Sequence, residues 1–543
     1  SFYDNSSLAF LPSSGAGKDG KAYSIKPTDG TGDFTFSRGS NLAATRVGPT
    51  GLIEKGRENL LTYSNQFDTT WVNSSTTETG GQSGYDGSNN AWLLTKTAPN
   101  GRIYQNVSSS GVQTFSVYAK ANASNWTQLR LLGVTTEYAY FDLQNGAVGT
   151  TSLDIDSNIE DIGGGWYRCS IVSNNSLTNV RIFVADNDND TSGTSGSIYI
   201  QDAQLEIGLA ATDYIESGAT TGKAGLLEDE PRFDYSGGAT CPSLLLEPSR
   251  TQLCLNSEYY SGSDWISSNV TITDNVTTSP EGVQNASLIN FTSSGNYFQH
   301  NGPAIVSGAT YTISCYVKRA ISTDQVFKIY GNNNKASANL TATSEWQRFT
   351  HTFTADSTNF ASGLSAPSTA QIHLYGFQAE QGSYPTSYIP NHSGGTITRG
   401  AEASSVMDVP NFTGSPSVSL FVDLGEWKGS DINNSNIYLS SASFSTQIQI
   451  RLRPDGMRVY LLNINGTDQY LNLGVTTASK ILIKYDGNEY VLFINGVEIQ
   501  TAASVGDSKY EKLYFNGYST TLISKLLLFP EALSDADCIT LTT

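Results

Sequence analysis

The sequence predicts an all-β protein in which tandem β-sandwich modules of the jelly-roll type follow an extended N-terminal arm. Composition, an internal repeat and short segments of alternating apolar and polar residues lead to this prediction. The 543 residues include 51 Gly, 29 Tyr and 22 Phe but only 2 Met, and 15% of them are charged. This composition favours short strands and tight turns over exposed helices. The chain is also too long for one hydrophobic core, so several domains are expected.

Four sequence blocks occur twice in the same order, which indicates that one module has been duplicated. The first copy contains RENLLTYSNQFDTTW (57–71), TFSVYAK (114–120), GWYRCSI (165–171) and QLEIGLAATDYI (204–215). The second copy contains RTQLCLNSEYYSGSDW (250–265), YTISCYVK (311–318), EWQRFTH (345–351) and QAEQGSYPTSYI (378–389). Four tryptophans match between the copies, so we interpret them as packing residues: Trp71, Trp166, Trp265 and Trp346.

The block TFSVYAK alternates with the period of two that is typical of a β-strand. Its apolar face carries Phe115, Val117 and Ala119, and its polar face carries Ser116, Tyr118 and Lys120. A shift of one residue would turn the apolar set toward water, so the buried face is well specified. We expect the polar face to meet solvent, a ligand or a neighbouring subunit.

The repeat and the changes in composition divide the chain into five parts. These are an N-terminal arm (1–55), a first jelly-roll module (56–222), a linker (223–248), a second jelly-roll module (249–404) and a final sandwich (405–543). The arm is rich in Gly, Ser, Asp and Pro and too poor in apolar residues for a core of its own. We therefore expect it to pack on a neighbouring module or to dock on a partner.

The final sandwich carries clear turn and helix signals. Residues 480–497 read KILIKYDGNEYVLFINGV, in which Asp-Gly and Asn-Gly predict two tight turns of a three-strand meander. Near residue 530, a strand meets Pro530 and a short helix is expected to follow. Ser534 and Asp537 have the spacing of a capping box at the start of that helix.

Charge and cysteine content exclude several classes of protein. The net charge is −19 and no basic stripe is present, so nucleic acid is not an expected partner. No stretch approaches the ~20 apolar residues of a membrane span, and the opening SFYDNSS lacks the features of a signal peptide. The odd number and wide scatter of the cysteines argue against a disulfide framework or a zinc site. We interpret them as buried free thiols: Cys169, Cys241, Cys254, Cys315 and Cys538.

Two further stretches read GDFTFSRGSNLAATRVGPTGLIE (32–54) and PRFDYSGGATCPSLLLEPSRTQLCLNSE (231–258). They resemble segments of phage tail-fibre and head-fibre-type virion structural proteins, although Gln252 stands in place of the usual Asn. The blocks QLEIGLAATDYI and QAEQGSYPTSYI resemble the closing strand of carbohydrate-binding-module-like jelly rolls. KYDGNEYVLFINGV and SKLLLFPEALSDAD resemble the concanavalin A-like, laminin-G-like sandwich.

The resemblance covers most of residues 30–543 and implies a component of the virion surface, assembled in the host cytoplasm. It also implies a homo-oligomer, with a trimer expected, that joins other virion proteins through the N-terminal arm. We expect a receptor-binding adhesin that recognises a host-surface polysaccharide or glycoconjugate. The alternatives are a structural head or tail decoration protein, whose modules bind other virion proteins, and a glycan depolymerase.

Catalysis finds little support in the residue pattern, and we expect no enzyme. The four histidines form no HExxH motif, and GxSxG does not occur in a strand-turn-helix setting. Asp423 and Glu426 are three residues apart, which predicts opposite faces of a strand. That is a poor arrangement for two carboxylates that flank a glycosidic bond.

A candidate glycan-binding patch lies in the segment WTQLRLL (126–132). Trp126, Gln128 and Arg130 alternate with Thr127, Leu129 and Leu131, so they share a face if the leucines enter the core. Sugars stack on aromatic rings while amide and guanidinium groups bind their hydroxyls, and Tyr118 could extend the patch. The alternative is a subunit interface, where Trp, Tyr and Arg are also enriched.

A candidate calcium site lies in the segment DNDND (186–190). Asp186, Asp188 and Asp190 alternate, and carboxylate oxygens at this spacing suit Ca²⁺. The full calcium-loop pattern is absent, since there is no Gly at its sixth position and no Glu at its twelfth. The alternative is a solvated acidic loop.

Overall fold

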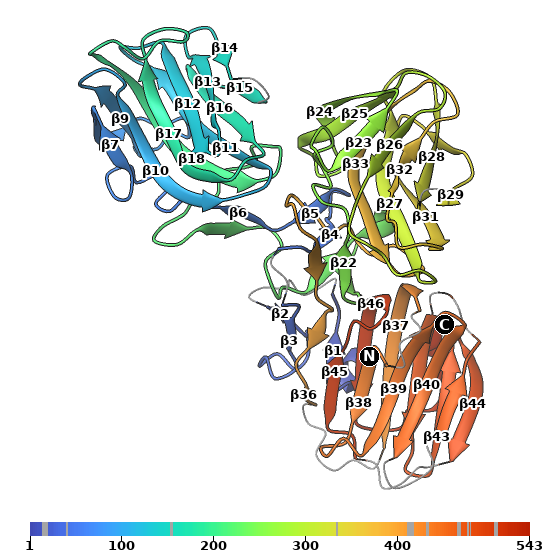
Figure 1. Ribbon diagram of the computed structural model, residues 1–543. Coiled ribbons are helices and arrows are strands. Elements are labelled where there is room, and N and C mark those ends of the chain that lie inside the picture. The colour runs from blue at the N-terminus through green and yellow to red at the C-terminus, as the bar shows by residue number, and fades with distance from the viewer. Residues whose placement is uncertain are drawn as a thin grey trace.

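The computed structural model describes residues 1–12, 20–39, 42–152, 156–332, 335–409, 417–429, 434–463, 469–474, 477, 479–503 and 509–543. Its elements are almost all strands, and they form three β-sandwiches, which confirms the predicted fold class (Figure 1). Two α-helices lie in the described part of the chain, α1 (Phe2–Asn5) and α2 (Asp535–Thr542). None of the helices described here is long and apolar enough to cross a membrane.

The first sandwich consists of two six-stranded sheets, in the orders β14-β13-β12-β17-β10-β7 and β15-β16-β11-β18-β9-β8. Its strands are β7 (Val72–Ser74), β8 (Thr76–Gln82), β9 (Ala91–Lys96), β10 (Arg102–Ser109), β11 (Gln113–Ala121), β12 (Trp126–Gly133), β13 (Thr136–Asp142), β14 (Ala147–Thr151), β15 (Ser157–Gly163), β16 (Trp166–Ser173), β17 (Leu177–Ala185) and β18 (Gly196–Ile207). The predicted apolar face of β11 enters the core, where Phe115, Val117 and Ala119 are fully buried.

The second sandwich has the sheet orders β23-β26-β32-β28-β29, with β30 beside β28, and β24-β25-β33-β27-β31. Its strands are β23 (Trp265–Ser268), β24 (Val270–Thr278), β25 (Gln284–Phe291), β26 (Tyr297–His300), β27 (Thr310–Arg319), β28 (Gln325–Gly331), β29 (Lys335–Ala336), β30 (Leu340–Ala342), β31 (Gln347–Thr354), β32 (Ser362–Ser365) and β33 (Ala370–Gln381). Its core contains the alternating residues Ile313, Cys315 and Val317 of β27.

Matching residues of the two jelly rolls make matching hydrogen bonds. In the first, Gln204 donates to Glu206 (2.7 Å), and the Thr212 hydroxyl donates to the same carboxylate (2.6 Å). In the second, Gln378 donates to Glu380 (2.6 Å), and the Thr386 hydroxyl donates to that carboxylate (2.7 Å). The sequence repeat is therefore a structural repeat that extends to its buried polar groups.

The third sandwich packs an eight-stranded sheet, β20-β21-β46-β37-β42-β43-β44 with β1 beside β46, against the six-stranded sheet β36-β45-β38-β39-β40-β41. Its C-terminal strands are β36 (Met407–Asp408), β37 (Val418–Lys428), β38 (Ile437–Ser440), β39 (Thr446–Arg453), β40 (Gly456–Asn463), β41 (Gln469–Asn472), β42 (Ser479–Tyr485), β43 (Glu489–Ile494), β44 (Val497–Ala503), β45 (Lys512–Phe515) and β46 (Thr520–Phe529). As predicted, β42, β43 and β44 form a meander, and the Ser534 side chain accepts the Asp537 backbone N–H at the start of α2.

Strands from the arm and the linker complete this third sandwich. From the arm, β1 (Leu8–Phe10) pairs with Leu526–Leu528 of β46. From the linker, β20 (Arg232–Asp234) pairs with β21 (Ser243–Leu246), which in turn pairs with β46. Leu8, Ala9 and Phe10 are fully buried. The arm thus packs on a module of its own chain, although the sandwich that it joins is the most distant one in sequence.

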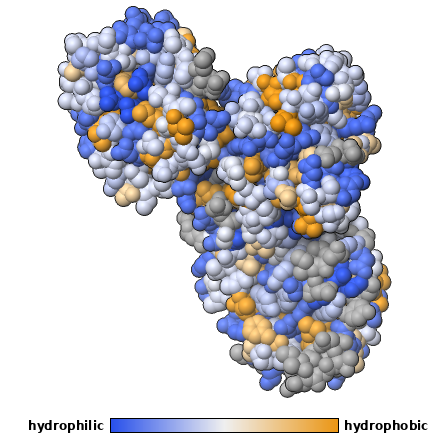
Figure 2. Space-filling view, viewed as in Figure 1, coloured by the Kyte–Doolittle hydropathy of each residue, from blue (hydrophilic) through white to orange (hydrophobic). Residues whose placement is uncertain are grey.

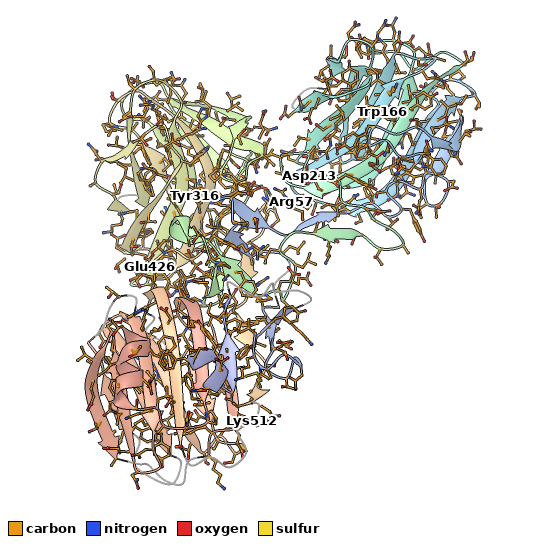
Figure 3. All side chains as sticks on the ribbon, turned by 180° about the vertical axis from the view of Figure 1, so that it is seen from behind. Arg57, Trp166, Asp213, Tyr316, Glu426 and Lys512 are labelled. Atoms are coloured by element: carbon orange, nitrogen blue, oxygen red, sulfur yellow. The ribbon has the colours of Figure 1, made fainter. Side chains whose placement is uncertain are left out.

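Short strands and buried ion pairs join the three sandwiches. The short strands are β2 (Lys21–Ala22), β3 (Phe34–Ser37), β4 (Thr45–Val47), β5 (Ile53–Lys55), β6 (Arg57–Asn59), β19 (Gly222–Ala224), β22 (Arg250–Gln252), β34 (Ile397–Arg399) and β35 (Ala403–Ser404). Arg232 of the linker lies 2.8 Å from Glu247 and 2.6 Å from Glu402, and all three side chains are buried. Arg57, labelled in Figure 3, lies at the joint between the first and second sandwiches, 2.8 Å from Glu281.

The surface carries no broad apolar area on the face seen in Figure 2, where apolar residues form small separate patches among polar ones.

All five cysteines are free. Four are buried, whereas Cys241 is exposed, so the interpretation of five buried thiols is wrong for Cys241.

Candidate functional site

The outer face of the sheet that contains β12 carries a patch of aromatic, amide and arginine side chains. Strand register places Gln128 of β12 between Tyr140 of β13 and Phe183 of β17. The next row places Arg130 between Tyr138 of β13 and Arg181 of β17. We call this surface the β12 face; its members are Arg102, Tyr104, Trp126, Gln128, Arg130, Tyr138, Tyr140, Arg181 and Phe183.

Gln128 lies at the centre of the β12 face and is fully buried. Neither its Oε1 nor its Nε2 has a hydrogen-bond partner among the residues that the structure describes. A buried polar group without a partner costs about 1–3 kcal/mol, so native proteins seldom keep one without a reason. A polar ligand group that reached this amide would offset that cost.

The arginines of the β12 face are held against aromatic rings. The guanidinium carbon of Arg130 lies 4.5 Å from the ring centroid of Phe183, and that of Arg102 lies 5.5 Å from the same centroid. Arg181 lies 5.6 Å from the ring centroid of Tyr104. These cation–π contacts fix the guanidinium planes and leave their N–H edges for other partners.

Electrostatic shifts on the β12 face follow from burial and from like charges. Burial lowers the pKa of Arg130; Tyr140, which hydrogen-bonds the guanidinium, acts to raise it, and the neighbouring Arg102 lowers it again. The pKa of Arg181 is lowered by burial and then by Arg102 and Arg130. Burial raises the pKa of Tyr140, so this phenol stays protonated and keeps a hydrogen-bond donor.

Trp126 lies at the end of β12, partly exposed, beside the loop that follows β17. A Cβ atom added to Gly149 would lie 2.6 Å from the Trp126 ring and 2.5 Å from Asp188 Oδ1. Any side chain at residue 149 would therefore collide with both groups. The absence of a side chain there leaves room for the indole and the acidic loop to lie close together.

Tyr118, the fourth residue of the predicted patch, lies elsewhere. Its strand, β11, belongs to the opposite sheet of the sandwich. The Tyr118 ring stacks on Tyr85 at a centroid distance of 3.9 Å, and Arg168 lies 5.2 Å from it. Tyr118 is only 8% exposed. The structure therefore brings Trp126, Gln128 and Arg130 together but does not bring Tyr118 to them.

Two of the three residues on the polar face of β11 depart from expectation, whereas Lys120 is partly exposed. Ser116 and Tyr118 were expected to meet solvent, a ligand or a subunit, but both are buried. Arg168 covers this face, where it donates to the Ser116 hydroxyl (3.2 Å) and to the backbone carbonyl of Thr212. The segment after β18 thus folds back over the sheet and seals its polar side.

The three aspartates of the candidate calcium site point to separate partners. Asp186 pairs with Lys96 (2.6 Å), Asp188 accepts the backbone N–H of Thr150 (2.7 Å), and Asp190 accepts that of Ser192 (2.8 Å). Among the described residues, no group of three or more His, Cys, Asp or Glu side chains is placed to hold a metal ion. The protein's own donors thus occupy carboxylate oxygens that a cation would need.

The second jelly roll provides an internal comparison for the β12 face. Thr114 and Thr312 occupy matching places, since their hydroxyls donate to Gly208 (2.8 Å) and to Gly382 (2.9 Å). Counting on from these residues, the core positions Leu129 and Leu131 match the buried Phe327 and Ile329. Trp126, Gln128 and Arg130 then match Asp324, Val326 and Lys328. The duplicated fold therefore keeps the core but does not require the β12 face.

Sequence reasoning missed the members of the β12 face that lie on β10, β13 and β17: Arg102, Tyr104, Tyr138, Tyr140, Arg181 and Phe183. Alternation is visible in EYAYFD (137–142) and NVRIFVA (179–185), and it could have assigned these side chains to the outer side of their strands. The order of strands in the sheet is what places them beside β12, and a single sequence does not reveal that order.

No known family profile matches the chain, and no curated protein matches it either. Among solved structures, the Ruminococcus gnavus IT-sialidase CBM40 bound to α2,3-sialyllactose is similar at 15% identity over 23% of this chain and 83% of that one, with a TM-score of 0.19. The N-terminal CBM22-1–CBM22-2 tandem domain of Paenibacillus barcinonensis Xyn10C is similar at 12% identity over 60% of this chain and 98% of that one, with a TM-score of 0.20. Such low scores leave any functional argument to the geometry of the β12 face.

Proposed function

We propose that this chain is a non-catalytic carbohydrate-binding protein and that its first jelly roll binds a saccharide on the β12 face. The observation that carries the proposal is the fully buried, unpartnered amide of Gln128 at the centre of a face of aromatic rings and arginines. Binding sites for small ligands combine apolar and aromatic surface with a few convergent polar groups.

Each part of the β12 face has a role in this proposal. Trp126 and Tyr138, both partly exposed, offer ring faces to the C–H surfaces of sugar rings. Arg130 offers N–H donors to hydroxyl oxygens, and its Nε has no partner among the described residues. Because Gln128 is fully buried, the ligand must first displace neighbouring side chains of the β12 face. The amide then accepts a hydrogen bond from one hydroxyl and donates to another.

The comparison of the two jelly rolls supports the proposal. The second copy folds with Asp324, Val326 and Lys328 where the first has Trp126, Gln128 and Arg130. Packing therefore does not explain why these three side chains gather on the first copy. Partly exposed aromatic and charged groups that the fold does not need, such as Trp126 and Arg130, are a signature of binding surfaces.

At a finer level, we propose a receptor-binding adhesin on the surface of a phage virion, a trimer that recognises host-surface glycans. The resemblance of residues 32–54 and 231–258 to virion structural proteins supports this. The arm remains our proposed attachment region for other virion proteins. Its attachment residues would be exposed ones, since Leu8, Ala9 and Phe10 are buried in the third sandwich.

A structural decoration protein is the second candidate. The observation that favours it is the composition of the β12 face, because Trp, Tyr and Arg are also enriched at protein interfaces. In that case the β12 face would be covered by another virion protein and would bind no saccharide in solution.

The test is a glycan-array screen of the full chain, followed by calorimetric titration of any positive saccharide. We expect Trp126→Ala to abolish binding and Lys328→Ala, at the place that matches Arg130, to leave it unchanged. EDTA is expected to have no effect, since the acidic loop gathers no metal-binding group. A folded protein that binds no saccharide would favour the decoration protein, and release of new reducing ends would favour a depolymerase.

A further inference from the structure

We infer that the saccharide bound on the β12 face is acidic and that its anionic group is held by Arg102, Arg130 and Arg181. The inference rests on the proposed function and names the class of ligand. It is carried by the gathering of three guanidinium groups on one sheet face without a carboxylate to pair with them.

Strand register brings these three arginines together. Arg130 lies opposite Arg181 in the pairing of β12 with β17, and Arg102 lies opposite Phe183 in the pairing of β10 with β17. Arg130 and Arg102 both contact the Phe183 ring. The three charges are close enough to perturb one another. Arg102 acts to lower the pKa of Arg130, and Arg102 and Arg130 both act to lower the pKa of Arg181.

Neutral groups accept the hydrogen bonds of these arginines. Arg181 donates from Nε to Asn179 Oδ1 (2.7 Å), and Arg102 donates from Nη1 to the backbone carbonyl of Asn100 (3.1 Å). In the described part of the chain, no ion pair within 4.0 Å includes Arg102, Arg130 or Arg181.

Arginines at the joints between the sandwiches are paired with carboxylates instead. Arg232 and Arg399 each lie 2.8 Å from Glu247, and Arg57 lies 2.8 Å from Glu281. The chain has 50 acidic residues against 31 basic ones, so carboxylates are plentiful. None of them forms an ion pair with the three clustered guanidinium groups in the described part of the chain, which leaves a local positive charge on a protein whose net charge is −19.

Carboxylate and phosphate groups are the natural complements of such a cluster. A guanidinium presents parallel N–H donors that match two oxygens of either anion, and such charge-assisted bonds are stronger than neutral ones. Because cation–π contacts already orient Arg102, Arg130 and Arg181, little side-chain freedom is lost when an anion binds. An anion also relieves the repulsion among the three charges.

A small acidic saccharide fits this surface better than a polyanion such as nucleic acid. The chain's net charge of −19 repels an extended polyanion, whereas one or two acidic groups need only the local charge of the arginines. Beyond the arginines, Gln128 and Trp126 continue the face with neutral groups that suit the hydroxyls and C–H surfaces of sugar rings. At the Trp126 end the charge turns negative, since Asp188 lies beside the indole.

The experiment measures binding of the full chain to matched saccharides by calorimetry: a digalacturonate, its neutral methyl ester, and a disaccharide that carries one phosphate. We expect at least one acidic probe to bind about tenfold or more tightly than the ester, which corresponds to the strength of a charge-assisted hydrogen bond. Preference for the carboxylate or the phosphate probe distinguishes the two sources of charge. Affinity for the acidic probe should fall as salt is raised from low to physiological concentration.

Variants separate the inference from the proposed function. Arg130→Gln and Arg181→Gln should each remove most of the preference for the acidic probe, while Lys328→Gln in the second jelly roll should not. Arg181→Lys keeps the charge but loses the planar fork, so it should bind with intermediate affinity. Thermal melting identifies any variant that fails to fold, and the salt dependence of the unaltered protein needs no variant.

The outcomes distinguish the two claims. Equal binding of acidic and neutral saccharides that still depends on Trp126 would overturn the acidic ligand and leave the proposed function standing. A folded protein that binds none of the probes, nor any saccharide of the array, would overturn both. An acidic preference that Arg130→Gln and Arg181→Gln do not change would place the anion elsewhere and overturn the inference.

Discussion

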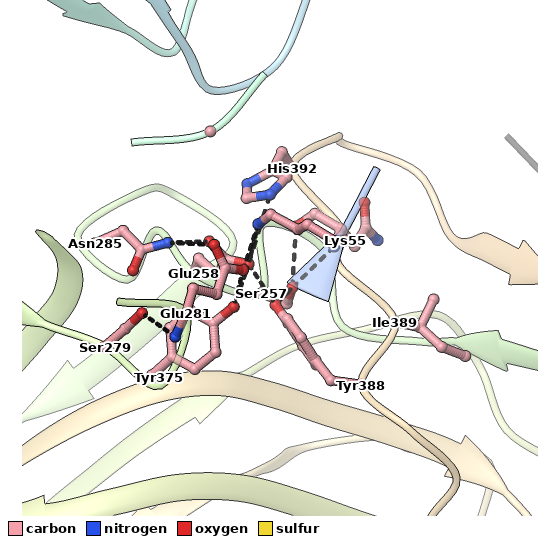
Figure 4. A network of polar contacts seen from close by, with 12 residues as sticks. Lys55, Ser257, Glu258, Ser279, Glu281, Asn285, Tyr375, Tyr388, Ile389 and His392 are labelled. Atoms are coloured by element: carbon pink, nitrogen blue, oxygen red, sulfur yellow. Dashed lines mark hydrogen bonds and ion pairs between the residues drawn. The ribbon is translucent and has the colours of Figure 1, made fainter. Parts of the chain in front are cut away.

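Lys55 Nζ lies 2.6 Å from the carboxylate of Glu281, and the two side chains are only 6% and 0% exposed. Lys55 belongs to the segment that leads into the first jelly roll, whereas Glu281 belongs to the second. Figure 4 shows that the same ammonium group also faces Glu258, at 3.3 Å. The joint between the two jelly rolls is thus a buried network of charges rather than an apolar contact alone.

Lys55→Met should destabilise the protein strongly, because it leaves two buried carboxylates without their shared cation. We expect a loss of about 3–5 kcal/mol in the free energy of unfolding. Urea unfolding followed by tryptophan fluorescence measures it. The control is Lys223→Met, which removes an exposed pair with Glu228 and should cost less than about 1 kcal/mol. Equal losses in the two variants would contradict a special role for the buried network.

Stability should fall in acid through the buried glutamates of the joints. Burial acts to raise the pKa of Glu281, but the charges of Lys55 and Arg57 outweigh it and lower the pKa to about 2. The pKa of Glu247 is likewise lowered to about 2, by Arg399 and Arg232 against the effect of burial. A carboxylate with a lowered pKa stabilises the folded state above its unfolded value of 4.5, and this contribution is lost as the pH falls toward 2.

The measurement is the free energy of unfolding between pH 7 and pH 2.5. We expect a flat profile from pH 7 to pH 5 and a steady loss below pH 4.5, with a shallower slope in Glu281→Gln because one titrating group is removed. Stability that increased between pH 4.5 and pH 2.5 would contradict the lowered pKa values.

Gln128→Leu should separate stability from binding. Leucine removes two buried polar atoms that have no partner in the described part of the chain, so the fold should be unchanged or stabilised by up to about 1 kcal/mol. Saccharide binding should weaken, since the amide at the centre of the β12 face is lost. The matched control is Gln105→Leu on β10, whose amide bonds both polar groups of the Thr62 backbone. That variant should lose about 1–3 kcal/mol, while binding persists in the folded fraction. Thermal melting and calorimetric titration give the two readouts.

Phe10→Ala should destabilise the third sandwich, although residue 10 is far from it in sequence. The Phe10 ring is fully buried against Phe34 and Phe515, with centroid distances of 5.3 and 6.2 Å. Removing it should cost about 3–5 kcal/mol. Val134→Ala is the control, because Val134 is 83% exposed and its loss should change stability by less than about 0.5 kcal/mol. Differential scanning calorimetry measures the melting temperatures. Equal melting temperatures for Phe10→Ala and Val134→Ala would contradict a stabilising role for the Phe10 ring.

The sequence predicts the fold class, the duplication and the turns of the third sandwich because each depends on local pattern. Asn495 and Gly496 adopt the left-handed conformations that the Asn-Gly turn between β43 and β44 requires. Long-range pairing was not predictable: nothing in residues 8–10 indicates that they pair with residues 526–528. The same limit explains Tyr118, whose cover comes from Tyr85 and Arg168, each far from it along the chain.

For the candidate site, period-two alternation was sufficient to place Trp126, Gln128 and Arg130 on one face, because all three lie on one strand. It was not sufficient to find Arg102 and Arg181, whose contribution depends on β17 lying between β12 and β10. The charge of the β12 face is therefore a property of the sheet order, and it is invisible in any one strand.

The pairing of Leu8 with Leu528 also sets the order in which the molecule can be completed. During synthesis, residues 8–10 emerge long before residues 526–528, and both jelly rolls can fold in the interval. Until β46 arrives, the apolar side chains of β1 have no partner strand and stay exposed to other chains. A chain that ends before β46 would therefore keep an uncovered apolar strand at its N-terminal end, and exposed apolar segments of this kind are what chaperones and proteases act on.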